Sequence, residues 1–191
     1  MPGSANRKRA AARLAVVQAL YELDVSEASA DAVITAFLKD NWLESVSDPG
    51  MTAFDAPHFG EVVRAVEARR PALDAAVNAA LAAKLQVERL EVLLRSILRA
   101  GAYELSARYD IPANVIINEY VEVAHAFFGG KEPALVNAVL DSLAKSMGRG
   151  ESDGATATRP NDPAESDSDA DAGQGSAEAA GQDASGDKRS G

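Results

Sequence analysis

The spacing of apolar residues limits the fold of this chain more than any other feature of the sequence. Leu90, Leu94, Ile97, Leu98, Gly101 and Leu105 form one stripe at the period of an α-helix. Arg95 and Arg99 fall on the opposite side of that helix. The other apolar segments recur at the same period, and no segment shows the alternation or the glycine–asparagine turns of a β-hairpin. The sequence therefore predicts an all-α protein.

Helix-breaking residues divide this periodic part into seven helices. The predicted helices cover residues 7–24, 29–43, 57–69, 71–84, 87–108, 112–127 and 133–147. The segment 44–57 is a loop with Asp48-Pro49-Gly50 as its turn, and Pro71 and Pro112 start helices. Gly101 within an apolar stripe costs about 1 kcal/mol of helix propensity relative to alanine. We therefore expect another helix to cross closely over Gly101.

The end of the chain has a different composition. Residues 149–191 carry a net charge of −6 and contain no Val, Ile, Leu, Met, Phe, Tyr or Trp. A segment without large apolar side chains cannot offset the entropy of ordering its backbone. We therefore predict a folded domain at residues 1–148 and a disordered acidic low-complexity tail at residues 149–191.

The N-terminus is basic, whereas the rest of the predicted domain is acidic. Residues 1–13 carry Arg7, Lys8, Arg9 and Arg13 and no acid, while residues 14–148 carry a net charge of −8. Leu14, Val17 and Tyr21 form the apolar stripe of the first helix, and its arginines fall on the flank of that stripe. The basic end can bind RNA phosphates or only solubilise the N-terminus, and composition favours neither interpretation.

Several functional classes find no support in the sequence. The sequence has no cysteine and no apolar run of the roughly 18 residues that a membrane span needs, and no hydrophobic signal core follows its basic N-terminal residues. Gly129-Gly130-Lys131 lacks the spacing of a phosphate-binding loop, and His125 with Glu122 supplies too few ligands for a metal. We therefore expect a soluble cytoplasmic protein that is not an enzyme and that uses no cofactor, metal or membrane.

A longer pattern in the sequence is more specific than any of these motifs. It consists of LRAGAYEL at 98–105, Ile111-Pro112, VIINEYVEVA at 115–124 and LVNAVLD at 135–141, together with Arg13 and VQALY at 17–21. This pattern closely resembles the NusB family of bacterial transcription antitermination factors. The resemblance covers roughly residues 7–147.

The resemblance implies a fold, a function and a set of partners. It implies seven helices in two three-helix subdomains. The implied function is to bind a boxA-type element of single-stranded RNA jointly with NusE, a small-subunit ribosomal protein. The implied assembly includes the RNA polymerase elongation complex, acts notably on rRNA operons and assists small-subunit rRNA maturation. Because NusE-type proteins are basic, we expect NusE to meet the acidic helical body.

The resemblance also implies the residues on the RNA side. These are Arg7, Lys8, Arg9, Arg13, Gln18, Tyr21, Lys131 and Asn137. Guanidinium groups neutralise phosphates, Tyr and Arg planes stack on unpaired bases, and Gln and Asn read base edges. From its place on the apolar stripe, Tyr21 is expected in the core rather than on RNA. Lys131 lies in a turn that the resemblance places close to the N-terminal arm.

The chain departs from the family pattern in ways that bear on RNA affinity. In the family, the basic run of the N-terminal arm often continues at the positions where this chain has Ala10-Ala11-Ala12. Leu135 stands where the family usually has Phe, and Lys131 stands where an acid is common. Two other functions are compatible with the helical pattern. An rRNA cytosine methyltransferase would need a following nucleotide-binding domain, which residues 149–191 cannot supply. A helical protein–protein adaptor without RNA affinity remains as the alternative function.

Overall fold

A computed structural model describes residues 4–39, 54–82 and 85–149, and these ranges contain seven α-helices and no strand. The helices are α1 (Ser4–Val25), α2 (Ala30–Lys39), α4 (Ala56–Ala68), α5 (Arg70–Ala80), α6 (Val92–Ala107), α7 (Ala113–Phe127) and α8 (Glu132–Ser146). A 3-10 turn, η1 (Val87–Arg89), precedes α6. The predicted all-α class is confirmed. The predicted turn at Asp48-Pro49-Gly50 and residues 150–191 lie outside the described residues.

The helix predicted at residues 87–108 is interrupted near its start. Val87–Arg89 form the 3-10 turn, Leu90 has extended backbone angles, and α6 begins only at Val92. The side-chain oxygen of Asn78 in α5 accepts a hydrogen bond from the Val87 N–H at 2.8 Å, which holds the start of the 3-10 turn. The apolar period continues through the interruption, so the pattern alone could not reveal it.

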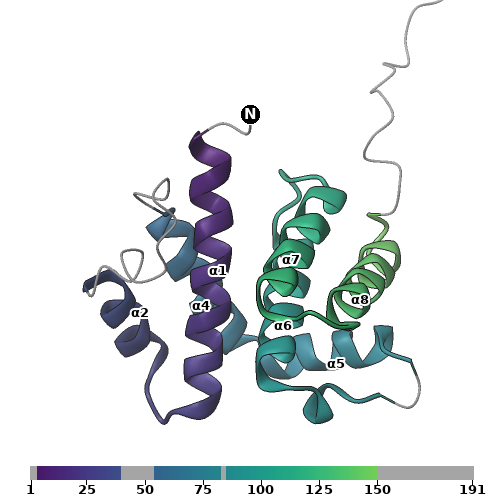
Figure 1. The fold of residues 1–191 in the computed structure, drawn as a ribbon, viewed down its shortest axis with the longest axis horizontal. Coiled ribbons are helices and arrows are strands. Elements are labelled where there is room, and N and C mark those ends of the chain that lie inside the picture. The colour runs from purple at the N-terminus through teal and green to yellow at the C-terminus, as the bar shows by residue number, and fades with distance from the viewer. Residues whose placement is uncertain (1–3, 40–53, 83–84, 150–191) are drawn as a thin grey trace, which may run out of the picture. The chain divides into compact units, whose positions relative to one another are not determined.

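The described helices pack as two groups of three that share a long interface (Figure 1). Helices α1, α2 and α4 contact one another, as do α6, α7 and α8. Helix α5 packs against α6 and α8, and α6 also contacts α1 and α4. This arrangement agrees with the expected pair of three-helix subdomains and makes α6 the central helix.

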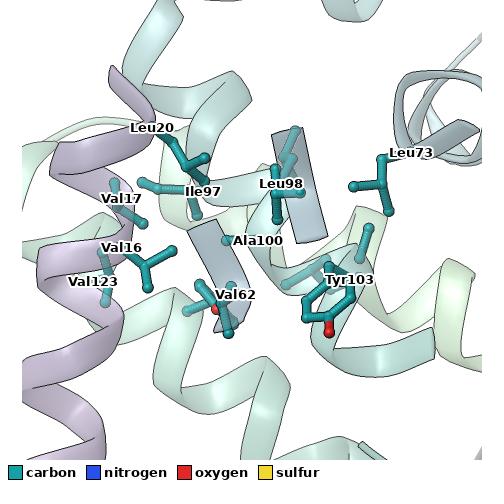
Figure 2. Close-up of a cluster of buried hydrophobic side chains, with 14 of the residues drawn as sticks. Val16, Val17, Leu20, Val62, Leu73, Ile97, Leu98, Ala100, Tyr103 and Val123 are labelled. Carbon is teal, nitrogen blue, oxygen red and sulfur yellow. The ribbon is translucent and has the colours of Figure 1, made fainter. Parts of the chain in front are cut away.

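The core lies where α1, α4 and α6 meet. Figure 2 shows Val16, Val17 and Leu20 of α1 in one cluster with Val62 of α4 and Ile97 of α6. All five are at most 3% exposed. Full burial of a side chain of this size stabilises a fold by about 1.5–3 kcal/mol. The cluster therefore fixes α1 firmly on α6.

The close approach expected at Gly101 is confirmed. A Cβ atom placed on Gly101 would lie 2.7 Å from Cδ1 of Leu140 in α8. Leu140 itself is 0% exposed, so the leucine fills the space that a side chain would need. Glycine therefore lets α8 pack close to α6.

Arg149 belongs to the folded part rather than to the tail, which corrects the predicted boundary by one residue. Its side chain is buried and donates hydrogen bonds to the backbone carbonyls of Leu105 and Ile111. The sequence contains no apolar residue larger than alanine after Met147, so the composition rule assigned Arg149 to the wrong segment. Separately, no helix in the described ranges has the length and apolar character needed to cross a bilayer.

Candidate nucleic-acid interface

The first turns of α1 present the basic side chains of the chain's N-terminal part. Arg7 and Lys8 are exposed, and the side chain of Arg9 is 41% exposed. Asp55, at the start of α4, lies 3.9 Å from Arg9 and donates its backbone N–H to the Lys8 carbonyl at 3.2 Å. We call Arg7, Lys8 and Arg9 the basic arm. It is held at its base by the N-terminus of α4.

Arg13 does not belong to this exposed surface. Its side chain is 2% exposed and binds Glu104 of α6 through Nε and Nη2, at 2.9 and 2.7 Å. Its second terminal nitrogen lies 3.3 Å from Glu119 of α7. The expectation that Arg13 shows its guanidinium at the edge of the buried face is therefore wrong. Arg13 joins α1 to α6 and α7.

Glu104 is the centre of a buried polar network. Tyr120 donates its hydroxyl to Glu104 Oε1 at 2.8 Å, and His58 Nε2 lies 3.2 Å from the same oxygen. Arg108 approaches His58 Nδ1 at 3.1 Å. Because a guanidinium can only donate, Nδ1 must accept, and the His58 proton must sit on Nε2, where it points to Glu104.

Two opposing effects set the charge state of Glu104. Burial raises the pKa of Glu104, but hydrogen bonds from His58 and Arg13, with the Arg13 charge, lower that pKa to about 2. Burial alone would lower the pKa of Arg13, but its pairing with Glu104 raises it above the usual range. Both groups are therefore ionised at neutral pH, and each compensates the buried charge of the other.

The alanines that interrupt the basic arm have a structural reason. Ala11 and Ala12 are 2% and 0% exposed, because α1 packs closely on α4 and α6. A lysine or arginine at either position would have to bury its stem and charge at a cost of several kcal/mol. Only Ala10 is partly accessible. The short basic arm therefore follows from how deeply α1 is packed.

Tyr21 is exposed, so its expected place in the core is wrong. Its exposed fraction is 43%, whereas Val16 and Leu20 of the same helix are at most 3% exposed. The buried face of α1 is thus turned away from Tyr21. Gln18 is half-buried on the same helix. Tyr21 is accessible to a ligand.

Lys131 lies far from the basic arm. Helix α7 runs beside α1 in the same direction: Arg13 meets Glu119, and Val123 lies further along, in the cluster that contains Val17 (Figure 2). Lys131 follows the end of α7, and Figure 1 shows that turn at the lower end of α7, opposite the N-terminus of α1. The expectation that the turn of Lys131 lies close to the N-terminal arm is therefore wrong. Lys131 is exposed.

Asn137 is exposed on α8, a helix that packs on α5, α6 and α7. The structure therefore brings Gln18 and Tyr21 together on α1, with the basic arm at one end of that helix. It places Lys131 beyond the end of α7 and Asn137 on a separate helix, α8. From Arg7 to Tyr21 a helix rises about 21 Å, so a ligand that touches both must be extended.

A second ionic network holds the C-terminal end of α1. Asp24 accepts hydrogen bonds from Arg70, and from Arg95 and Arg99 at 2.9 Å each, while Arg99 also binds Asp74 at 2.6 and 2.8 Å. Burial raises the pKa of Asp24, but the three arginines outweigh it and lower that pKa. Arg95 and Arg99, on the side of α6 opposite its apolar stripe, thus bind acids of α1 and α5. Arg99 is only 6% exposed.

The fold is thus an all-helical domain whose first helix is anchored by buried ion pairs and begins with a basic arm. The family model described as "NusB family" matches residues 10–145. The chain is 40% identical over 145 residues to the transcription antitermination protein NusB of Caulobacter vibrioides, a match that covers 76% of this chain and 97% of that protein. It is 45% identical over 143 residues to the protein of that name from Rhodopseudomonas palustris, covering 74% and 83%.

A solved structure of T. maritima NusB has the same fold. The TM-score is 0.57 at 27% sequence identity, and the match covers 72% of this chain and 90% of that one. The chain therefore belongs to the NusB family, whose matched members carry the name of transcription antitermination proteins.

Proposed function

We propose that this chain is a transcription antitermination factor that binds boxA-type single-stranded RNA through the basic arm. The observation that carries this proposal is the exposure of Arg7 and Lys8 at the N-terminal end of a long helix. The partial positive charge of a helix N-terminus adds to the attraction of these side chains for phosphate. The matched relatives are named transcription antitermination proteins, and these names support antitermination as the process that the RNA binding serves.

The other proposed RNA contacts lie along α1 and beyond it. Tyr21 stacks on a base, Gln18 and Asn137 read base edges, and Lys131 attracts a phosphate. Arg13 leaves this set, because its buried guanidinium is occupied by Glu104. Its proposed part is to fix the position of α1, and so of the arm.

Removing the basic arm is expected to reduce the salt dependence of RNA binding. Each phosphate of a single strand that the protein no longer neutralises flattens the slope of log K against log salt by about 0.7, so replacing Arg7, Lys8 and Arg9 by alanine should flatten it by roughly 2. Fluorescence anisotropy with boxA-type RNA at several salt concentrations measures the slope. Lys131→Asp should weaken binding further, because the two sites are far apart and their effects add.

A matched control variant removes three positive charges from parts of the surface outside the basic arm. Lys39, Arg64 and Lys145 are exposed on α2, α4 and α8, and their triple alanine variant should keep the wild-type slope. If the arm variant also keeps it, the arm only solubilises the N-terminus. That result would favour the alternative function of a helical adaptor without RNA affinity.

The proposed protein partner is NusE, in an assembly with the RNA polymerase elongation complex that serves rRNA operons and small-subunit rRNA maturation. Residues 14–148 carry a net charge of −8, which complements a basic ribosomal protein. We expect NusE binding to weaken as salt rises, chiefly through a lower association rate. Surface plasmon resonance at low and high salt measures that rate, and an equal rate at both would contradict an electrostatic contact.

A further inference from the structure

The end of α8 folds back onto the end of α6 around Arg149. Gly148 has a positive φ of 72°, and the hydrogen bonds Arg149 N–H to Ala144 O and Gly148 N–H to Lys145 O, at 2.8 and 3.1 Å, close the helix. This is the Schellman arrangement, which glycine favours because it has no Cβ. The turn directs Arg149 back across the molecule rather than away from it.

Arg149 fixes an exposed aromatic ring. Its guanidinium donates to the carbonyls of Leu105 and Ile111, and its Cζ lies 4.8 Å from the ring centroid of Tyr109. The guanidinium is buried, so the ring has a stationary charged group against one face. Tyr109 is nevertheless 69% exposed. We call this pair the Tyr109–Arg149 platform.

A cavity opens beside the platform. It has a volume of about 330 Å³ and is lined by Tyr109, Asp110, Pro112, Met147, Gly148 and Arg149. The Asp110 carboxylate is held by the fork of Arg108 at 2.9 and 2.8 Å, while its side chain remains 60% exposed. Hydrogen bonds from Arg108 lower the pKa of Asp110 to about 2, so this oxygen acceptor stays ionised. A carboxylate at the rim disfavours phosphate and suits the amino group of a base.

The platform lies close to the basic arm. A series of contacts connects them: Asp55 N–H donates to Lys8 O at 3.2 Å, Asp55 Oδ1 accepts from the His58 N–H at 3.1 Å, and Arg108 reaches His58 Nδ1 at 3.1 Å. Arg108 is also the group that holds Asp110. A single strand whose phosphates meet the arm can therefore place a neighbouring base on Tyr109.

We infer that the Tyr109–Arg149 platform is an additional nucleobase-stacking site for the single-stranded RNA that the basic arm binds. This inference rests on the proposed function and extends its site beyond α1. A base covers the open face of Tyr109, while its exocyclic amino group donates to Asp110. The recognition is by stacking and tolerates different bases, because every base has a π-face.

The test compares RNAs of different length with variants of Tyr109 in the full chain. The RNAs are a boxA-type oligonucleotide and the same oligonucleotide with three adenosines added at its 5′ or its 3′ end. Stacking of one base on an aromatic side chain is worth about 1–3 kcal/mol. One of the two extended RNAs should therefore bind the wild type about tenfold more tightly than the short RNA. Tyr109→Phe should keep this gain, and Tyr109→Ala and Tyr109→Leu should lose it.

The controls separate stacking from charge and from folding. Because Tyr109 contacts no phosphate in this proposal, Tyr109→Ala should keep the salt slope of the wild type. 2-Aminopurine placed in the extension should lose fluorescence on binding the wild type and Tyr109→Phe but not Tyr109→Leu, which retains apolar bulk without a π-face. Thermal unfolding of each variant confirms that it is folded.

Two outcomes overturn the inference. One is an affinity gain from extension that Tyr109→Ala retains, and the other is the absence of any gain with either extended RNA. If the arm variant flattens the salt slope but the Tyr109 variants do not change the affinity gain from extension, only the inference about the platform is rejected. If the arm variant leaves the salt slope unchanged, the proposed function is rejected, and the inference that rests on it is rejected with it.

Discussion

Replacing Glu104 by glutamine is expected to lower the free energy of unfolding by about 3–5 kcal/mol, the usual cost of leaving a buried charge without its partner. Arg13 is 1% exposed, and its remaining ion-pair partner within the described ranges would be Glu119, at 3.3 Å. Glutamine has nearly the same volume as glutamate, so a change in packing contributes little. Urea denaturation at neutral pH measures the difference.

Two further variants test the reason for this loss. Glu122→Gln removes an exposed carboxylate from α7 and should change stability by less than about 0.5 kcal/mol. Arg13→Met combined with Glu104→Leu removes both charges and should recover part of the loss, because no charge of the pair is then left alone although Tyr120 and His58 lose an acceptor. A loss below about 1 kcal/mol in Glu104→Gln would show that water or Glu119 compensates Arg13.

The buried pair also determines how the proposed RNA site is presented. Arg13 lies between the basic arm and the apolar part of α1, and it binds acids on α6 and α7. The opposite end of α1 is fixed by Asp24 and its three arginines. Ionic contacts at the middle and at the C-terminal end of α1 thus set the direction and rotation of this helix. The rotation in turn decides that Tyr21 is exposed.

Periodicity predicted the helices well because their breaks are local. The start of α7 after Pro112 and the end of α8 near Met147 each depend on a few neighbouring residues, and both were predicted within about two residues, as is usual for helix ends. Gly101 was interpreted correctly because its cost to a helix is also local. The break at Leu90 was not predicted, because the apolar period continues through it and no glycine or proline marks it.

The positions of the arginines could not be predicted in the same way. Arg13 and Arg99 count as polar in any pattern, which predicts the flank of the apolar stripe for Arg13 and the side opposite the stripe for Arg99. Arg13 is buried because Glu104, 91 residues away, supplies a matching carboxylate. No rule of spacing along one helix contains that information. The resemblance drew attention to Arg13 as an RNA ligand, whereas the structure gives it an acidic partner in the core.

The candidate site was predicted in part for the same reason. Exposure of Arg7 and Lys8 follows from their place before the first large apolar residue of α1. The Tyr109–Arg149 platform was missed, because Arg149 was counted with a tail that has no large apolar residue. One local signal was available: Gly148 directly follows the last helical residues, and a glycine there commonly ends a helix and directs the next residue back onto it.

Acid is expected to destabilise the chain through Glu104. The pKa of Glu104 is lowered in the folded protein from its ordinary value of 4.5 to about 2. A carboxyl group with a depressed folded-state pKa contributes stability above its unfolded-state pKa and loses it as the pH falls through the folded-state pKa. The stability from this group is therefore full at pH 7 and declines between about pH 5 and pH 2. At about 1.36 kcal/mol per pKa unit, the loss is about 3 kcal/mol.

The double variant Arg13→Met, Glu104→Leu isolates this contribution. Asp24, whose pKa is also lowered, and the acids of residues 150–191 are present in both chains, so their titration cancels in the comparison. His58 and Tyr120 lose a charged partner in the variant, but neither is removed. Urea denaturation at pH 7, 5, 4 and 3 should show the wild type losing stability more steeply than the double variant. Parallel losses in the two chains would mean that the folded protein does not hold Glu104 in its charged form more strongly than the unfolded chain does.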